Sequence, residues 1–406
     1  MTADIGIAKA SRLEETAPDY PGLNIQVNPI RNYPYGSTLA HLLGYVGQIN
    51  PRELEKLRDQ GYRAQDDIGK MGVEEAYDRY LRGRSGLEQL QVNARGYRDR
   101  VLNRVRPRPG DNIRLTLDLR AQRILDELMS GWNGAAVLMA PGSGDILALI
   151  SHPAFEPNLL VRPVRKDDVD QIFSDPRAPL LNRAVGGEYP PGSPFKLVVG
   201  LAALDNGFSP DTVYDCRGIF FLGDSSFRCW KPSGHGRLQM EEAIKHSCNI
   251  YFYNLGQVVG MDRITEMARR LGFGKRPELK LRGVKGGFIP DREWKKEETG
   301  ESWYPGDTVN LSIGQGYLLV TPLQMAQFGS LIATGGTLYR PRLIETIIAP
   351  EGQPILENPP RVQMVLDLPS RIWEVLRGGM FRVVSEEHGT GRRADHAREP
   401  TEGKNG

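Results

Sequence analysis

Residues 188–207 read EYPPGSPFKLVVGLAALDNG and contain the most informative pattern of the sequence. The Pro-Pro-Gly at 190–192 ends any preceding element, and Pro194 suits the first turn of a helix. The run that follows is largely apolar and closes at the Asp-Asn-Gly of 205–207, which predicts a helix of about three turns. Because this helix is apolar on nearly all sides, we expect it to be buried, with Ser193 at its N-terminus.

Ser193 and Lys196 form a candidate catalytic pair. Residues three positions apart lie on the same face of a helix, so the Lys196 amine is expected one turn from the Ser193 hydroxyl. Serine is a weak nucleophile unless a base removes its proton, and lysine serves as that base only when its pKa is depressed. The backbone N–H of Ser193, at the positive end of the helix, can face a developing oxyanion. The same spacing also arises by chance, with the serine as an ordinary helix cap.

The whole sequence has the composition of a folded protein of about two domains. It has 406 residues, 39% of them hydrophobic and 25% charged, which excludes a disordered or collagen-like chain. Lys and Arg number 52 and Asp and Glu 50, a balance too even for a protein that coats nucleic acid. No apolar run is long enough to span a bilayer, and no export signal is visible. If the protein works outside the cytoplasm, we expect this chain to lack its front end.

A Pro/Gly-rich segment, RPRPGDN at 106–112, predicts the domain boundary. Residues 1–108 are polar and are expected to form an extended module with a modest core. Residues 109–406 are expected to form the second domain. The arginine-rich run at 95–108 is interpreted as a solvated face rather than a lipid-headgroup patch, because the overall charge is even.

The start of the second domain shows an α+β pattern. Residues 113–117 alternate like a strand, and Asp118 can cap a helix with an apolar face. Residues 135–139 and 146–150 are apolar runs of strand length, separated by the turn-rich PGSGD. A helix beside an antiparallel hairpin indicates an α+β domain.

A second chemical motif follows the first at Ser247-Cys248-Asn249. A hydroxyl and a carboxamide can hold a lysine amine, relay a proton to a leaving group and bind a substrate amide. The triplet alone is a weak signal, because polar residues of this kind cap helices in many proteins.

These motifs together resemble those of the penicillin-binding transpeptidases. The segment NRAVGGEYPPGSPFKL at 182–197 resembles their nucleophile motif, and Ser247-Cys248-Asn249, between AIKH and IYFYNLG, resembles their S-x-N motif. NLSIGQG at 310–316, followed by TPLQ at 321–324, resembles a further signature of the domain.

The front of the chain resembles the pedestal of class B penicillin-binding proteins, which lack a glycosyltransferase of their own. The resemblance rests on RNYPYGSTLAHLLGYVG at 31–47, GKMGVEEAYDRYLRGRSG at 69–86 and QLQVNARGYR at 89–98. The insert CRGIFFLGDSSFRCWKPSGHG at 216–236 is most similar to the elongation-specific branch.

The resemblance implies a β-lactamase-like α/β sandwich in residues 109–406, with a central antiparallel sheet and the nucleophile helix between layers. Its C-terminal strands and helix are expected to be missing. Residues 1–108 are implied to be a partial pedestal of the dimerisation type. We therefore expect a chain truncated at both ends.

The family's third motif is Lys, then Ser or Thr, then Gly, and its cation receives the substrate carboxylate. Here the chain ends Gly403-Lys404-Asn405-Gly406, after an HGTG segment at 388–391 that resembles the lead-in to that motif. Lys404 is thus a candidate substrate-binding residue, although Asn405 replaces the hydroxyl residue. The alternative is that Lys404 belongs to a disordered tail.

The reaction implied by the resemblance is peptidoglycan D,D-transpeptidation during cell elongation, through an acyl-enzyme on Ser193 and without a cofactor. Lys196, Ser247 and Asn249 complete the implied catalytic set. The implied partners are stem peptides, β-lactams and a membrane-embedded glycan polymerase of the elongation complex, at the periplasmic face of a bacterial inner membrane, with the anchor outside this chain. The alternatives are a hydrolase of the same fold and a non-catalytic penicillin sensor or polymerase-activating scaffold.

The three cysteines and one histidine form a candidate metal site. Cys216, Cys229, His235 and Cys248 supply three thiolates and an imidazole, a complete tetrahedral zinc set. One disulfide would leave a spare thiol, whereas zinc uses every cysteine. In the elongation-specific branch that this chain resembles, some members bind zinc at this place with carboxylates among the ligands. The resemblance therefore implies a structural zinc ion here. A Cys216–Cys229 disulfide and three inert buried thiols are the alternatives.

Overall fold

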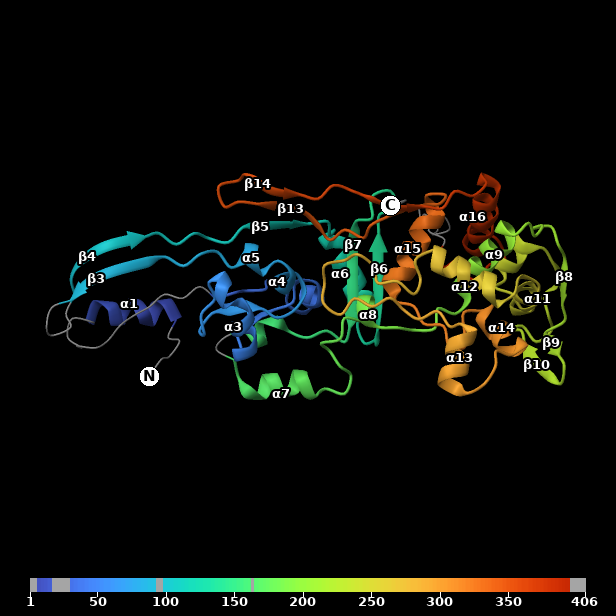
Figure 1. The fold of residues 1–406 in the computed structure, drawn as a ribbon, viewed down its shortest axis with the longest axis horizontal. Helices are drawn as coiled ribbons and strands as arrows, with labels where there is room; N and C mark the ends of the chain where they lie inside the picture. Colours follow the sequence, from blue (N-terminus) through green and yellow to red (C-terminus); the bar gives the residue numbers. More distant parts are fainter. Residues whose placement is uncertain (1–5, 17–29, 93–97, 162–163, 395–406) are drawn as a thin grey trace, which may run out of the picture.

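The computed structural model describes residues 6–16, 30–92, 98–161 and 164–394. The molecule is elongated, with a narrow N-terminal part at one end and a helical lobe at the other (Figure 1). Among the described helices, none combines the length and apolar character that crossing a membrane requires.

The N-terminal part is built from short elements around a small core. After α1 (Gly6–Thr16), its elements are η2 (Gly36–Leu39), α2 (Ala40–Leu43), β1 (Val46–Gln48), α3 (Pro51–Leu57), η3 (Arg58–Gln60), β2 (Asp67–Gly69), α4 (Gly72–Ala76) and α5 (Asp78–Leu81). Strands β1 and β2 pair antiparallel, and Ile49, Tyr62 and Ile68 form the core beside them. The expected modest core is confirmed.

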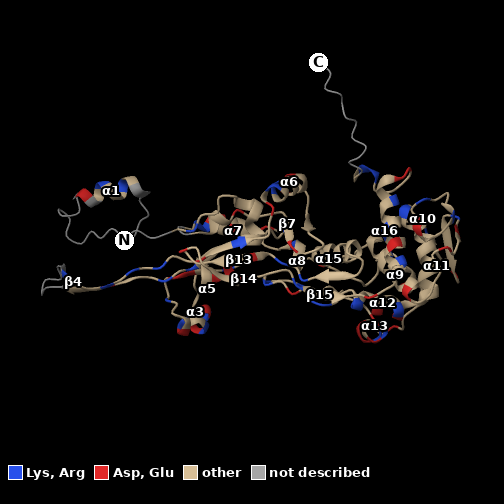
Figure 2. Cartoon of the chain, turned by 90° about the horizontal axis from the view of Figure 1, so that it is seen from above, with Lys and Arg blue, Asp and Glu red and all other residues tan. Residues whose placement is uncertain are grey.

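A two-stranded arm, β3 (Leu87–Val92) paired with β4 (Arg98–Val105), extends away from the body (Figure 2). Arg100 and Arg104 on this arm are exposed; Arg104 pairs with Glu88 at 2.9 Å, and Arg100 donates to Gln91. Exposure of these two arginines fits both a solvated face and a lipid-headgroup patch, so the interpretation of the arginine-rich run stays a prediction.

Residues 33–42 connect the N-terminal part to the rest of the molecule. The Tyr33 backbone N–H donates to the Asn158 side chain at 2.9 Å, and the Asn182 side chain donates to the His41 carbonyl at 3.2 Å. Ala40 is buried in a cluster with Phe155 and other apolar residues of the C-terminal part. The N-terminal part is therefore held against the segment that leads to Ser193.

The first elements of the C-terminal part confirm the predicted helix and hairpin. Strand β5 (Asn112–Leu115) leads to α6 (Leu119–Met129), whose Asp118 cap accepts from two backbone N–H groups. Strands β6 (Gly134–Met139) and β7 (Ile146–His152) pair antiparallel.

The packing of α6 differs from its apolar pattern. Its Leu128 is 68% exposed, whereas Gln122 is fully buried. The Gln122 side chain accepts from the Leu149 backbone N–H at 2.9 Å and donates to the Leu149 and Thr38 carbonyls. A buried amide, rather than an apolar stripe, holds this helix to β7.

The remaining strands form small antiparallel sheets of two or three strands. Strand β13 (Ile344–Ile348) lies between β5 and β14 (Pro354–Glu357), and β12 (Thr337–Tyr339) pairs with β15 (Val362–Val365). The insert contributes β8 (Tyr214–Cys216) paired with β11 (Gly236–Leu238), and β9 (Ile219–Leu222) paired with β10 (Ser225–Arg228).

Helices make up most of the lobe around Ser193. They are η5 (Ser193–Phe195), α9 (Lys196–Asp205), α10 (Met240–Lys245), α11 (Asn249–Val259), α12 (Met261–Arg270), α13 (Arg292–Thr299), α14 (Pro305–Leu311), α15 (Pro322–Ala333), α16 (Ser370–Ser385) and η6 (Arg392–Ala394). Outside this lobe, η4 (Pro157–Leu160) and α7 (Lys166–Ser174) lie beside the N-terminal part, and α8 (Arg183–Gly186) packs against β6 and β7 (Figure 1).

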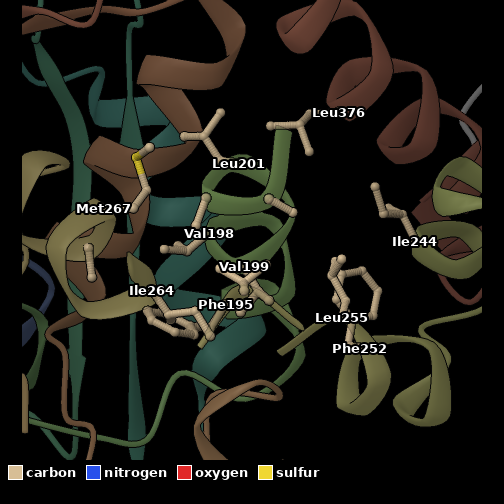
Figure 3. Packing of buried hydrophobic residues seen from close by; sticks show 14 of the residues in the cluster. Phe195, Val198, Val199, Leu201, Ile244, Phe252, Leu255, Ile264, Met267 and Leu376 are labelled. Carbon is tan, nitrogen blue, oxygen red and sulfur yellow. The ribbon is translucent and has the colours of Figure 1, made fainter. Parts of the chain in front are cut away.

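Helix α9 occupies the centre of the main core, as its all-round apolar sequence predicts. Figure 3 shows Val198 and Val199 of α9 among side chains of α11 and α12. Leu376 of α16 packs beside the middle of α9, where a Cβ on Gly200 would lie 3.5 Å from its Cδ2. Burying a side chain of this size contributes roughly 1.5–3 kcal/mol, so the position of α9 is strongly constrained. The element that carries the candidate lysine is therefore a rigid one.

Candidate active site

Ser193 opens a single 3₁₀ turn, Ser193–Phe195, and the α-helix proper begins at Lys196. Gly192, just before it, has a φ of 63°, a conformation that glycine adopts without strain. The Gly192 N–H donates to the Gly314 carbonyl at 2.9 Å, and a Cβ added at Gly314 would lie 2.2 Å from the Gly192 carbonyl oxygen. This close backbone contact fixes the segment just before Ser193, and the Ser193 side chain is exposed at the end of a buried helix.

Lys196 is only 3% exposed, and its amine is surrounded by oxygen atoms of the second motif. Nζ donates to the Ser247 carbonyl at 2.8 Å, to the Ser247 hydroxyl at 3.0 Å and to Asn249 Oδ1 at 2.8 Å. Burial lowers the pKa of Lys196 to about 8, and the nearby thiols of Cys248 and Cys229 oppose that shift. At pH 7 roughly a tenth of the amine is then neutral, far more than for a lysine with the ordinary pKa.

The structure brings together three of the four predicted catalytic residues through direct hydrogen bonds: Lys196, Ser247 and Asn249. Among the described residues, the hydrogen bonds of the Lys196 amine go to the second motif and none goes to Ser193. Hydrogen bonds between a nucleophile and its base are often long without substrate and tighten on binding. The transfer of the Ser193 proton to Lys196 stays a prediction.

The second motif lies in a sharp turn between α10 and α11. Ser247 has a φ of 46°, which is uncommon for a residue with a side chain and carries strain. The N–H groups of Ser247 and Cys248 donate to the carbonyls of Ile244 and Ala243, which hold the turn in place. This conformation presents both the carbonyl and the hydroxyl of Ser247 to Lys196.

The insert that follows α9 folds over the second motif. The Asn249 side chain donates to the Arg228 carbonyl at 3.3 Å, and the Trp230 indole donates to the His246 carbonyl at 2.9 Å. These contacts were not predicted from the sequence. Arg228 and Trp230 flank Cys229, which was predicted to share a metal site with Cys248 of the second motif, and this could have indicated that they lie near that motif.

The four predicted metal ligands converge. Their candidate donor atoms, on Cys216, Cys229, His235 and Cys248, all lie within 4.8 Å of one another. All three cysteines are buried and free of disulfides. A hydrogen bond with Cys248 lowers the pKa of Cys229, which favours the thiolate form that metals bind.

The distances in this cluster suit a zinc ion. His235 Nδ1 lies 3.5 Å from the sulfur of Cys216 and 3.5 Å from the sulfur of Cys229. Zinc bonds of about 2.3 Å to sulfur and about 2.0 Å to nitrogen, at a tetrahedral angle, separate those two atoms by about 3.5 Å. The donor set and its spacing therefore fit the metal.

The candidate third motif cannot be placed in this way, because Lys404 lies outside the described residues. The segment before it leaves α16 and passes α10. The Thr390 N–H and hydroxyl both point to the Lys245 carbonyl, at 3.4 and 3.3 Å. The chain thus runs beside the second motif shortly before the described residues end.

The signature at 310–316 positions the nucleophile loop, a role that sequence reasoning did not assign. The Ser312 hydroxyl donates to the Thr308 carbonyl, and a Cβ on Gly256 of α11 would lie 1.7 Å from that hydroxyl oxygen. Gly314, two residues later, makes the contact with Gly192. Gly314 and Gly316 of this signature were the sequence feature that could have indicated a close approach between two backbone segments.

The chain is similar in sequence to two protein-family models and to several known proteins. A model of the penicillin binding protein transpeptidase domain matches residues 134–406, and one of the penicillin-binding protein dimerisation domain matches residues 1–115. Peptidoglycan D,D-transpeptidase MrdA of Escherichia coli K12 is 36% identical over 378 residues, which cover 91% of this chain and 60% of the relative. MrdA of Haemophilus influenzae is 35% identical over 401 residues, with coverage of 95% and 60%. The chain spans about 60% of the length of these relatives.

Solved structures resemble the chain over both of its parts. A complex of penicillin-binding protein 2 and MreC from Helicobacter pylori has a TM-score of 0.84 at 30% identity, covering 96% of this chain and 71% of that chain. Penicillin-binding protein 2 of Pseudomonas aeruginosa, in complex with WCK 5153, has a TM-score of 0.77 at 36% identity, with coverage of 90% and 76%. A peptidoglycan synthase complex has a TM-score of 0.81 at 34% identity, with coverage of 97% and 69%.

Proposed function

Because this chain belongs to the penicillin-binding protein family, with a transpeptidase domain matched over residues 134–406, we propose that it is part of a peptidoglycan D,D-transpeptidase that cross-links stem peptides during cell elongation. The observation that carries the proposal is the buried Lys196 amine, held by Ser247 and Asn249 and one turn from the exposed Ser193. This arrangement suits acyl transfer through a serine ester.

In the proposed reaction, the Ser193 oxygen bonds to the carbonyl carbon of the penultimate D-alanine while the Ser193 proton moves to the Lys196 amine. The carbon–nitrogen bond then breaks, and the proton passes through the Ser247 hydroxyl to the nitrogen of the departing D-alanine. An amine on a neighbouring strand then bonds to the ester carbonyl carbon and loses a proton to Lys196. The carbon–oxygen bond to Ser193 breaks, Lys196 returns that proton to the Ser193 oxygen, and the cross-link and the free hydroxyl result. Asn249 holds the lysine and can bind a substrate amide.

Penicillin labelling of the native full-length protein tests this proposal. Fluorescent penicillin should attach covalently to Ser193, and Ser193→Ala should abolish the label. Labelling that survives the substitution would defeat the assignment. A hydrolase of the same fold would shed the label within minutes, whereas a transpeptidase retains it. Growth supported by Ser193→Ala in place of the wild type would favour the scaffold alternative.

The proposed setting follows from the relatives. One of the solved relatives is a complex with MreC and another is a peptidoglycan synthase complex. We propose a membrane-embedded glycan polymerase as partner and the periplasmic face of the inner membrane as location. The boundary between pedestal and transpeptidase domain is proposed at residues 108/109, and Lys404 is proposed to receive the substrate carboxylate.

A structural zinc ion is also part of the proposal. The three thiolates and His235 would hold it, and zinc supplies a structural cross-link rather than reaction chemistry. It would tie β8, the turn after β10 and the Ser247 turn together. Metal analysis of the purified protein should give about one zinc per chain, lost in Cys216→Ser. A metal-free protein with a Cys216–Cys229 disulfide in mass spectrometry would refute the zinc site.

A further inference from the structure

A two-stranded ribbon, β9 paired with β10, stands at the end of the molecule opposite the N-terminal part (Figure 1). Alternate side chains of a strand point to opposite faces. The inner face carries Phe220 and Phe227, whose ring centroids lie 5.7 and 5.8 Å from that of Tyr253 in α11. The outer face carries Ile219 and Phe221, which are 45% and 72% exposed. The inner aromatic contacts anchor the ribbon, and two large apolar side chains remain at the surface.

The same outer face carries polar and basic groups. Arg228 lies directly opposite Ile219 in the strand pairing, and Ser226 lies opposite Phe221. Both Arg228 and Ser226 are exposed. In the insert at 216–236, three Lys or Arg side chains and one Asp are exposed, so basic groups are in excess. We call Ile219, Phe221, Ser226 and Arg228 the outer ribbon face.

The outer ribbon face is joined to the proposed catalytic set. The Arg228 carbonyl accepts a hydrogen bond from the Asn249 side chain at 3.3 Å. Phe221 pairs with Ser226, two residues before Arg228, so it lies roughly 7 Å further along the ribbon. In an extended stem peptide, the four residues between the sugar and the carbonyl that Ser193 attacks span roughly 13 Å. A peptide bound at Ser193 is therefore long enough to bring its sugar to the outer ribbon face.

We propose that the outer ribbon face is a subsite for a sugar ring of the glycan strand whose stem peptide acylates Ser193. The inference rests on the proposed transpeptidase function and adds the glycan to the part of the substrate that is recognised. A pyranose ring presents C–H groups that pack on the Phe221 ring, because the face of an aromatic ring is electron-rich. The Arg228 guanidinium can donate to the carbonyl oxygens of N-acetyl groups. The strand also carries the carboxylates of its peptides, which suits the basic insert.

The size and polarity of the outer ribbon face favour this occupant over a protein. Strands β9 and β10 have four residues each. Such a ribbon is about 13 Å long, with its strands about 4.8 Å apart. A stable protein interface takes about 800 Å² from each partner, far more than this face offers. Serine and arginine beside two apolar side chains suit a ligand with an apolar face and polar edges, as a sugar has.

Competition with fluorescent penicillin tests the subsite in the native full-length protein. Two soluble ligands share one pentapeptide that ends in D-Ala-D-Ala. One of them carries the N-acetylglucosaminyl-N-acetylmuramyl disaccharide, and the other has no sugar. Each ligand competes with the penicillin for Ser193. We expect the disaccharide ligand to compete about tenfold better, because only this ligand contacts the outer ribbon face.

Substitutions of Phe221 locate the effect on the ribbon. Phe221→Ser should reduce the preference for the disaccharide ligand to about twofold or less, whereas Phe221→Trp should retain it because the indole also offers a ring face. Phe173→Ser, at a side chain of α7 that is 57% exposed, is the matched control and should keep the full preference. Penicillin carries no sugar, so its own rate of labelling should be the same in the unaltered protein and all three variants.

The outcomes separate this inference from the proposed function. If the unaltered protein is not labelled by penicillin at Ser193, the transpeptidase proposal fails and the subsite fails with it. If it is labelled but the two ligands compete equally, or if Phe221→Ser keeps the preference, the subsite alone is overturned. A dimer that Phe221→Ser dissociates, in a protein without a sugar preference, would assign the face to a second copy and overturn the subsite as well. The comparison of the two ligands on the unaltered protein needs no substitution, so misfolding of a variant cannot hide the result.

Discussion

Two regions of the lobe each bury a lysine, and they treat its charge in opposite ways. Lys196 is 3% exposed and Lys295 is 1% exposed. Burial lowers the pKa of both side chains, but Asp307 and Glu301 more than offset this at Lys295, whose pKa is raised. Lys196 faces a carbonyl, a hydroxyl and a carboxamide, and its pKa falls to about 8. The partner atoms, rather than burial, decide whether a buried lysine serves as a base or as a structural cation.

The largest expected effect on Ser193 acylation comes from replacing Lys196 with a residue that cannot lose its proton. Lys196→Arg keeps the charge and the hydrogen-bonding capacity, but a guanidinium remains protonated at working pH. Acylation of Ser193 by penicillin should slow by about a thousandfold, which is within the range of a lost general base. Stopped-flow labelling of the purified protein measures the rate. A slowing of less than tenfold would mean that Lys196 only positions its neighbours.

A smaller effect is expected when the Lys196 site is made to resemble the Lys295 site. Asn249→Asp is nearly isosteric and places a carboxylate 2.8 Å from the Lys196 amine, at the position of the present carboxamide oxygen. The pKa of Lys196 should then rise, and acylation at pH 7 should fall about tenfold or more because less neutral amine is present. Asn133→Asp, on the exposed surface, is the matched control. An unchanged rate in Asn249→Asp would contradict the comparison.

The Lys295 site should respond in stability rather than in proton transfer. Lys295→Met removes the buried cation and leaves Asp307, whose side chain is 18% exposed, with the Tyr304 backbone N–H but without a positive charge beside it. We expect a loss of roughly 2–3 kcal/mol in the free energy of unfolding, below the value for a fully buried pair because Asp307 retains some solvent. Urea denaturation gives the difference. A loss below about 0.5 kcal/mol would show that the pair is no stronger than a surface ion pair.

The local features of the fold were predictable from the sequence, because helix-breaking residues and the spacing of apolar residues act over a few positions. The bounds of α9 follow from the Pro-Pro-Gly before it and the residues at 205–207 after it. The convergence of Cys216, Cys229, His235 and Cys248 was predictable because three cysteines and one histidine restrict the chemistry, and the structure places their donor atoms within 4.8 Å of one another. Because Cys248 stands within the second motif, this convergence also places the insert beside that motif. That the four residues bind zinc stays a prediction.

Features that depend on distant backbone were not predictable. Nothing in the residue pattern indicates that Ser247 takes a left-handed conformation, which turns its carbonyl toward Lys196. The contact between Gly192 and Gly314 joins two segments far apart in the chain. An amphipathic helix is expected to bury its apolar face, but α6 leaves Leu128 exposed and buries Gln122. The Gln122 amide is buried because it hydrogen-bonds the backbone of Leu149 in β7.

The pH dependence of Ser193 acylation tests most directly whether a neutral Lys196 is the base. Because the neutral amine is the active form and its pKa is about 8, the rate constant for penicillin labelling should rise about tenfold per pH unit up to that value and then level off. A rate constant that stays flat between about pH 6 and pH 9 would contradict the account.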